Sequence, residues 1–161
     1  MKFPRKVALK LDSLWQRRFQ IQKYRLRILG AQIGSRNTFN GWVTVVGDYS
    51  NLKIGNENTF NQNVVINVNS LIHIGNQNHF SVGVKLITTR LDATLRTHLS
   101  FPIRIGNRNW LAADSIVAVS NHEIEINSGV TIAAKSFLNT SATQPGLYAG
   151  TPAVQIRTRS N

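Results

Sequence analysis

Apolar residues recur at every sixth position along most of the chain, from residue 33 to residue 138. The triplets with this spacing are Ile33/Phe39/Val45, Ile54/Phe60/Ile66, Ile74/Phe80/Leu86, Ile105/Leu111/Val117 and Ile126/Ile132/Leu138. An α-helix repeats about every 3.6 residues and an amphipathic strand about every 2, so neither matches this period. A period of six predicts a short strand followed by a corner. Three such units close one triangular coil, with one apolar side chain pointing inward on each side.

The phrase that opens each triplet also repeats. Ile33-Gly34-Ser35-Arg36-Asn37-Thr38-Phe39 returns in similar form from Ile54, from Ile74 and from Ile105, and a weaker copy starts at Ile126. Gly and Asn beside the isoleucine fit corners, because both tolerate left-handed backbone conformations. Stacked coils bury a continuous core that no single coil can bury alone. The repeat therefore predicts an all-β solenoid of parallel coils.

The spacing between triplets locates the interruptions in the repeat. From the last residue of one triplet to the first of the next, a perfect repeat needs six positions, whereas the chain has 9, 8, 19 and 9. The largest excess predicts a protruding loop at about residues 87–104. On a rigid scaffold such a loop is the natural place for function, because loops carry binding and catalytic groups. The alternative is a tolerated surface insertion.

The composition narrows the class of protein. The chain has 161 residues, one domain's worth, and no cysteine, which excludes disulfides and thiolate metal sites. No apolar run approaches the roughly 18 residues of a membrane span, and the N-terminus lacks the features of a secretory signal. We therefore expect a cytoplasmic protein. The net charge is +12, and most of it is concentrated in the first 30 residues.

Residues 1–30 predict a basic amphipathic helix that precedes the solenoid of residues 31–161. Pro4 suits the start of the helix and Gly30 its end. Its apolar face comprises Val7, Leu11, Leu14, Trp15, Phe19, Leu26 and Leu29. Two interpretations stay open: the helix caps the open end of the solenoid, or it lies on an anionic membrane surface. No nucleic-acid-binding module accompanies the charge, so we expect no nucleic-acid partner.

Besides the repeat, four sequence motifs resemble those of a known protein family. They are Ser100-Phe101-Pro102-Ile103-Arg104-Ile105-Gly106, Trp110-Leu111-Ala112-Ala113-Asp114, Gly129-Val130-Thr131-Ile132-Ala133-Ala134-Lys135-Ser136 and Tyr148-Ala149-Gly150-Thr151-Pro152-Ala153. In this order they resemble the hexapeptide-repeat acyltransferases, in particular the branch that O-acetylates sugars and polysaccharide precursors. The resemblance implies a left-handed parallel β-helix and a homotrimer. It also implies acetyl-CoA in a groove between subunits, a sugar or glycan acceptor, and a histidine base on the protruding loop.

The chain departs from the family at that histidine. The family pattern puts it near position 91, where this chain has Leu91. Our first candidate for the general base is His98, which lies in the same loop, and the second is His122. Asp92 or Asp114 is the candidate group to orient the base. Histidine suits the role because its ordinary pKa lies near neutrality. Both histidines also fit an ordinary polar surface role.

The resemblance also suggests residues for acetyl-CoA. Trp110 packs beside the groove, Ala113 and Ala134 line the pantetheine path, and Lys135 and Arg157 offer positive charge to the phosphates. The four histidines have no metal-binding spacing, so we predict no metal site. The alternative function is a catalytically inactive scaffold or partner subunit, which the departure at Leu91 favours.

Overall fold

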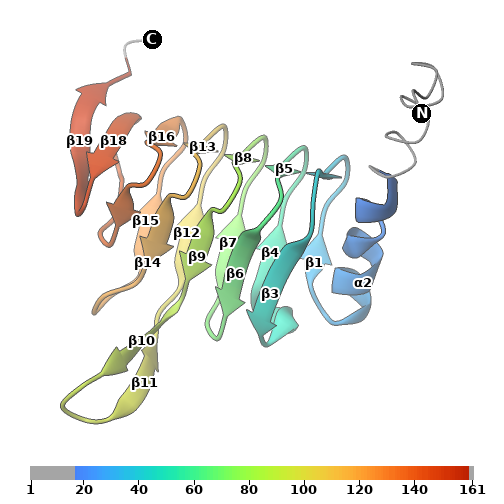
Figure 1. Cartoon of the computed structure of the whole chain (residues 1–161), viewed down its shortest axis with the longest axis horizontal. Coiled ribbons are helices and arrows are strands. Elements are labelled where there is room, and N and C mark those ends of the chain that lie inside the picture. The colour runs from blue at the N-terminus through green and yellow to red at the C-terminus, as the bar shows by residue number, and fades with distance from the viewer. Residues whose placement is uncertain (1–16, 160–161) are drawn as a thin grey trace, which may run out of the picture.

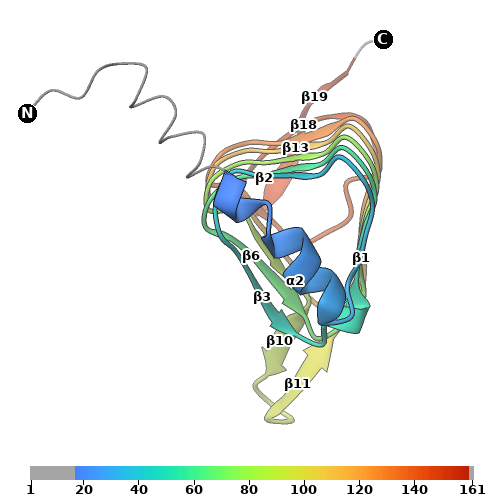
Figure 2. The same cartoon turned by 90° about the vertical axis from the view of Figure 1, so that its right-hand side faces the viewer.

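The structure, a computed structural model that describes residues 17–159, is a parallel β-helix of triangular cross-section (Figures 1 and 2). The first sheet comprises β1 (Gln32–Ile33), β4 (Leu52–Ile54), β7 (Ile72–Ile74), β12 (Ile103–Ile105) and β15 (Ile124–Ile126). The second comprises β2 (Thr38–Phe39), β5 (Thr59–Phe60), β8 (His79–Phe80), β13 (Trp110–Leu111), β16 (Val130–Ile132), β18 (Gly146–Gly150) and β19 (Ala153–Thr158). The third comprises β3 (Val43–Gly47), β6 (Val64–Val68), β9 (Lys85–Ile87), β14 (Ile116–Ala118) and β17 (Phe137–Leu138). All neighbouring strands of these sheets pair in parallel except β18 and β19.

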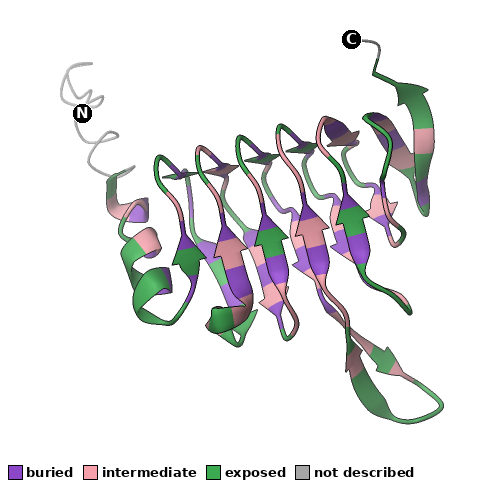
Figure 3. Ribbon diagram, turned by 180° about the vertical axis from the view of Figure 1, so that it is seen from behind, coloured by how far each residue is buried: buried purple, intermediate pink, exposed green. Residues whose placement is uncertain are grey.

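The interior confirms the six-residue period. Every member of the five predicted triplets is buried, and equivalent residues stack directly above one another (Figure 3). The rings of Phe39, Phe60 and Phe80 form one such column, with centroid separations of 5.2 and 4.7 Å. Complete burial of one phenylalanine side chain stabilises the fold by roughly 1.5–3 kcal/mol. The core is therefore a set of continuous apolar columns that run along the solenoid.

The repeated glycines have a different role from the one we predicted. Gly34, Gly55, Gly75 and Gly106 do not have a positive φ; the left-handed positions of this corner belong instead to Arg36, Glu57, Gln77 and Arg108. Glycine is required because the next coil lies too close for a side chain. A Cβ on Gly55 would lie 2.6 Å from the carbonyl oxygen of Gly75. Backbone approach between coils, and not backbone conformation, therefore fixes these glycines.

The repeated asparagines form a buried ladder along the same corner. Asn58 Nδ2 donates to Asn37 Oδ1 and to the carbonyl oxygen of Gly75, at 3.1 and 2.9 Å. Asn78 repeats both contacts one coil further on, with Asn58 and Gly106. These side chains satisfy buried polar groups that the turn leaves unpaired, and an unpaired buried group costs about 1–3 kcal/mol. The ladder thus fixes the stacking register.

The described part of the predicted N-terminal helix caps the first coil, as Figure 2 shows. Helix α2 spans Gln22–Ile28 and lies across the open end. Residues 17–19 are also helical, and a turn at residues 20–21 separates them from α2. Phe19 and Leu26 are buried as predicted, whereas Leu29 is exposed. The remaining predicted apolar positions, Val7, Leu11, Leu14 and Trp15, lie outside the described residues. The capping interpretation is therefore the one that these contacts favour.

Polar side chains of this segment pair with the free strand edges of the first coil. Gln20 Nε2 donates to the carbonyl oxygen of Phe39 at 2.8 Å, and Gln22 pairs with Gly41 and Val43 at 2.7 and 2.8 Å. Arg27 donates to the carbonyl oxygen of Ile33. Residues two apart point to different sides of a continuous helix. The turn at residues 20–21 breaks the single predicted helix and lets both glutamines face the coil.

The extra residues of the irregular coils gather at one corner, where the third sheet passes to the first. The 3₁₀ turn η1 (Tyr49–Asn51) lies there in the first coil. The longest insertion, residues 88–102, projects from the same corner as a two-stranded antiparallel hairpin of β10 (Thr89–Asp92) and β11 (Thr97–Ser100) (Figure 1). Residues 87, 103 and 104, which we had assigned to the loop, belong to solenoid strands.

Candidate active site

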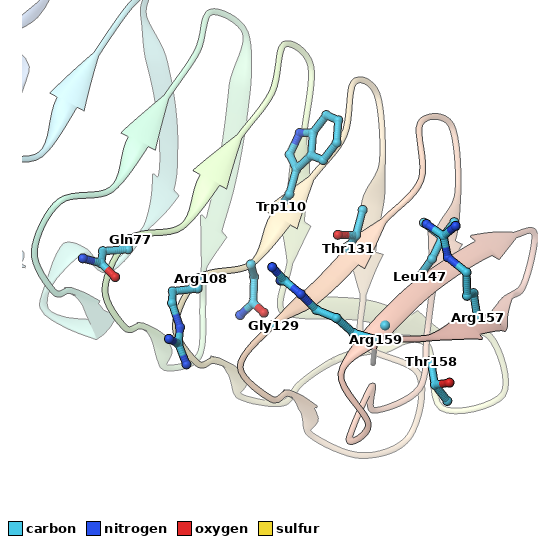
Figure 4. Close-up of a pocket in the computed structure, with 11 residues that line it drawn as sticks. Gln77, Arg108, Trp110, Gly129, Thr131, Leu147, Arg157, Thr158 and Arg159 are labelled. Atoms are coloured by element: carbon cyan, nitrogen blue, oxygen red, sulfur yellow. The ribbon is translucent and has the colours of Figure 1, made fainter. Parts of the chain in front are cut away.

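A cleft of about 570 Å³ lies against the outer side of the second sheet, near its C-terminal end (Figure 4). Strands β13, β16, β18 and β19 pair in register, which places Trp110, Thr131, Leu147 and Arg157 in one row across the sheet. The complete lining is Gln77, Arg108, Asn109, Trp110, Gly129, Thr131, Gly146, Leu147, Arg157, Thr158 and Arg159. Trp110 and Arg157, both predicted from sequence, thus meet in one cleft.

Trp110 gives the cleft a flat apolar wall. Its side chain is half exposed, and its indole Nε1 donates to Ser81 Oγ at 3.0 Å. This hydrogen bond fixes the ring against the second sheet while one side stays open to a ligand. An aromatic ring held in this way offers a large apolar contact area at little cost in conformational entropy.

The cleft is also cationic. Arg108, Arg157 and Arg159 line it, and no aspartate or glutamate does. Figure 4 shows Arg159 extending from the end of the chain towards Gly129. Guanidinium groups form bidentate, charge-assisted hydrogen bonds with phosphate oxygens. The cleft can therefore bind a ligand that combines phosphate groups with an apolar portion.

Two further arginines of the cleft, Arg108 and Arg159, are not predicted from the sequence. Arg108 occupies the variable fourth position of the repeated phrase, where earlier coils have Arg36, Glu57 and Gln77. The side chain at that position points outward at a corner, so packing in the core does not determine which residue occurs there. Its place in the repeat, next to the predicted Trp110, was the signal that would have identified it. Arg159 lies beyond the repeat, and no periodicity indicates it.

His98 lies on the hairpin directly opposite Leu91. The two residues are partners in the antiparallel register of β10 and β11, and both are exposed. Side chains of directly opposite residues project from the same face of a two-stranded ribbon, with Cβ atoms about 5 Å apart. His98 therefore projects beside the position at which the family pattern expects histidine. Thr89 and Ser100 share this face, and their hydroxyl oxygens are 2.9 Å apart.

Asp92 is held on the other face of the hairpin. Its carboxylate accepts hydrogen bonds from the backbone N–H groups of Leu95 and Thr94 and lies 3.0 Å from Arg90 Nη2. The pKa of Asp92 is lowered, chiefly by the hydrogen bond from the Leu95 backbone and also by Thr94 and Arg90. Residues that alternate along a strand project to opposite faces. The structure thus gives Asp92 a role in closing the hairpin turn and does not bring it to His98.

His122 lies in an exposed connection of the following coil, between β14 and β15. This connection leaves the same corner as the hairpin, because β9 pairs with β14 on one side and β12 with β15 on the other. The neighbouring Glu123 carboxylate lies 3.7 Å from Arg104 Nε. The two candidate histidines therefore belong to the same corner of the solenoid.

Ala113, Ala134 and Lys135 lie at a different corner, between the second and third sheets. The Lys135 backbone N–H donates to the Ala113 carbonyl oxygen at 2.9 Å, so these residues belong to adjacent coils. The Lys135 ammonium lies 3.9 Å from a carboxylate oxygen of Asp114. This ion pair is exposed and weak. None of the three lines the arginine-rich cleft.

A single protomer therefore separates the predicted residues into three places. In Figure 2 the hairpin leaves the corner opposite the second sheet, on which the cleft lies. Ala113, Ala134 and Lys135 lie at the corner where the strands of the second sheet end and the chain passes to the third sheet. Within residues 17–159, no three His, Asp or Glu side chains are grouped so as to hold a metal ion. In the same part of the chain, no helix is long and apolar enough to cross a membrane.

Comparison with known proteins confirms the resemblance to hexapeptide-repeat acyltransferases. No protein-family model matches the chain. A protein of Escherichia coli K12 assigned as the colanic acid biosynthesis acetyltransferase WcaF is 28% identical over 154 residues. The match covers 88% of this chain and 76% of that protein.

Two solved structures share the fold, which is a left-handed parallel β-helix. A hexapeptide-repeat-containing acetyltransferase of Vibrio cholerae has a TM-score of 0.80 at 19% identity and covers 98% of this chain and 91% of its own. The same protein has also been solved in complex with acetyl-coenzyme A. A maltose O-acetyltransferase of Clostridium difficile 630 has a TM-score of 0.72 at 23% identity, with 98% and 87% covered.

Proposed function

We propose that this chain is an O-acetyltransferase that moves an acetyl group from acetyl-CoA to a hydroxyl group of a sugar or polysaccharide precursor. The single observation that carries the proposal is the cleft in which Trp110 and three arginines meet on a hexapeptide-repeat scaffold. Coenzyme A combines phosphate groups with a long, uncharged arm, and this cleft combines cationic side chains with an apolar wall. The similarity to an acetyltransferase of colanic acid biosynthesis supports the acceptor class.

The arginines are the proposed phosphate ligands. Arg157 and Arg159 lie on and just beyond β19, and Arg108 approaches from the corner of the fourth coil. Trp110 supplies the apolar wall along which the rest of the donor extends. The alanines at positions 113 and 134 present only small side chains at their corner, where we propose that the pantetheine arm passes. Lys135, whose ammonium group is mostly exposed, adds positive charge there.

His98 is the proposed general base. A sugar hydroxyl becomes an effective nucleophile when its proton is removed as it attacks the thioester carbonyl carbon. The new C–O bond forms, the C–S bond breaks, and the proton held by His98 passes to the departing thiolate of coenzyme A. The developing oxyanion requires hydrogen-bond donors. His122 is the second candidate for the base, and no residue is proposed to orient either histidine.

We propose that the active unit is a homotrimer. In one protomer, the hairpin with His98 and the cleft with Arg157 lie on different sides of the triangular solenoid. The proposed base and the acetyl-CoA site of the same chain are therefore far apart. A hairpin from a neighbouring copy solves this problem if it reaches the cleft. We propose a cytoplasmic location at the inner face of the membrane, since polysaccharide precursors are often lipid-linked.

Calorimetric titration with acetyl-CoA tests the donor site first. Arg157→Ala should weaken binding by about tenfold or more, because it removes a charge-assisted hydrogen bond. Arg25→Ala is the matched control, since Arg25 is an exposed arginine on α2 at the other end of the solenoid. No binding by the wild-type trimer at saturating acetyl-CoA contradicts the proposal.

A second candidate function is a non-catalytic scaffold or partner subunit, which Leu91 favours. A screen of sugar acceptors with detection of released coenzyme A thiol separates the two. Transfer that His98→Ala abolishes and His122→Ala retains excludes the scaffold and assigns the base. Acetyl-CoA binding without transfer to any acceptor supports the scaffold.

A further inference from the structure

The outer side of α2 presents an apolar ridge at the N-terminal end of the solenoid. Leu26 and Gln22 point into the coil, whereas Ile21, Tyr24 and Ile28 on the opposite side are 64%, 55% and 84% exposed. In Figure 2, α2 lies across the open end, and no other described element covers its outer side. The three large apolar side chains, two on α2 and Ile21 just before it, form a patch that a capping role does not require, since the cap uses the inner side.

Cations flank this ridge on both sides. Lys23 and Arg25 lie beside it on α2, and the Lys23 ammonium is 5.1 Å from the centre of the Tyr24 ring. Arg17 precedes them, and both Arg17 and Arg25 are exposed, whereas Lys23 is partly exposed. No aspartate or glutamate occurs between residues 13 and 47. An apolar ridge bordered by basic residues is the pattern of a helix that lies in the plane of a membrane interface.

The positive charge of this surface distinguishes among three possible partners: residues 1–16 of the same chain, a second copy of α2, and an anionic lipid surface. Residues 1–16 of the chain carry Lys2, Arg5, Lys6 and Lys10 against Asp12 alone, so they are basic like the surface itself. A second copy of α2 would bring the same positive charge. An anionic lipid surface offers negative headgroups to the arginines and lysines and an apolar layer to Tyr24 and Ile28.

We infer that the outer side of α2 docks the protein on an anionic lipid bilayer, with Ile21, Tyr24 and Ile28 below the headgroups and Arg17, Lys23 and Arg25 among them. This inference gives the membrane contact of the proposed function its surface. It does not depend on acetyl transfer. The inner side of α2 stays bound to the first coil, so docking requires no unfolding of the cap.

Vesicle co-sedimentation of the full chain tests the inference. The wild-type protein should bind vesicles of phosphatidylcholine that contain about one third phosphatidylglycerol, and added salt should weaken binding. The double variant Tyr24→Ser/Ile28→Ser should bind roughly tenfold more weakly, because it removes apolar area from the buried ridge. Arg25→Gln should bind about fivefold more weakly to these vesicles and unchanged to pure phosphatidylcholine.

A matched control separates this surface from general hydrophobicity. Ile156 is 59% exposed on β19, at the opposite end of the solenoid, so Ile156→Ser should leave vesicle binding unchanged. Equal loss in Ile156→Ser and Tyr24→Ser/Ile28→Ser, or no vesicle binding by the wild type, overturns the inference. A change of oligomeric mass in the double variant, with wild-type vesicle binding retained, assigns the ridge to a protein contact and also overturns it.

Acetyl-CoA titration of the same variants keeps the two proposals apart. The α2 variants should bind acetyl-CoA as the wild type does, whereas Arg157→Ala should bind vesicles as the wild type does. Failure of vesicle binding therefore leaves the donor site untouched, and failure of acetyl-CoA binding leaves the docking surface untouched.

Discussion

The regular coils and the hairpin of residues 88–102 follow opposite rules. In the coils, apolar residues at every sixth position, and others between them, are buried against their equivalents above and below, and a polar ladder fixes the register. In the hairpin, Leu91, Leu95 and His98 are exposed, and Leu91 and His98 pair with each other. The coils therefore carry stability and the hairpin is free to carry chemistry. Substitutions in the two regions should affect different measurements.

The largest expected effect is on stability, in the phenylalanine column. Phe60→Ala should lower the free energy of unfolding by about 3–5 kcal/mol, because it leaves a cavity between Phe39 and Phe80. Chemical denaturation followed by circular dichroism measures the loss. Acetyl-CoA binding per folded molecule should persist. A loss below about 1 kcal/mol would show that the column collapses onto the gap.

The hairpin should give the reverse result. His98→Ala should lower the rate of acetyl transfer by about 10²–10⁴-fold, the usual contribution of a general base. Its free energy of unfolding should change by less than about 0.5 kcal/mol, since His98 is exposed. A rate loss that appears in His122→Ala and not in His98→Ala would transfer the role of the base to His122.

The asparagine ladders sharpen the comparison within the coils. Asn58→Ala should cost about 1–3 kcal/mol, because it removes a buried side chain and leaves the partly buried carbonyl oxygen of Gly75 without its donor. Asn56 is the matched control, because it belongs to a parallel but exposed ladder through Asn76. Asn56→Ala should cost less than about 1 kcal/mol in the same denaturation measurement. Equal costs would indicate that burial of the ladder contributes little.

The cap should give a smaller effect than the buried core. Gln22→Ala removes the side chain that pairs with Gly41 and Val43, and it should lower the free energy of unfolding by about 1–2 kcal/mol. Lys23→Ala, one position further on and partly exposed, should leave stability within about 0.5 kcal/mol of the wild type. Hydrogen exchange of the Val43 amide reports the same contact directly.

The smallest effect is the pH response of the hairpin turn. The pKa of Asp92 is lowered in the folded chain, mainly by the Leu95 backbone N–H, so the stabilisation is complete above the ordinary aspartate value of about 3.9. It is lost as the pH falls through the lower, folded value. The amide signals of Leu95 and Thr94 should therefore shift with a midpoint below about pH 3.9. In Asp92→Asn they should not titrate.

Much of the fold could be predicted because the same burial event repeats. Each coil places at least one apolar residue of the six-residue period on each side, and five copies of a weak signal in register make a strong one. The role of Gly55 was misjudged because the close approach comes from the next coil, which local conformation does not reveal. The turn at residues 20–21, which interrupts the predicted helix, was not predicted for a related reason. Gln20 and Gln22 both face the first coil because its strand edge offers unpaired backbone groups, and local sequence does not reveal that edge.

The candidate site was less predictable than the fold. Trp110 and Arg157 were found through family words and meet in one cleft, whereas Arg108 stands at a variable position of the repeat and Arg159 lies beyond it. Asp92 was named together with Asp114 as a group to orient the base, and no spacing argument singled out either. Strand alternation puts Asp92 on the other face, which depends on where the hairpin turns. Chemistry depends on such local geometry, whereas the core depends only on the repeat.

The cap formed by Gln20, Gln22 and Arg27 also sets the length of the molecule. A stack of parallel coils has no intrinsic end, because each coil offers the next one the same row of backbone donors and acceptors. An open first coil would template the last coil of another molecule and extend into a filament. The segment of residues 20–27 forms hydrogen bonds with these backbone groups on all three sides of the first coil. It therefore blocks end-to-end association of the solenoids at this end.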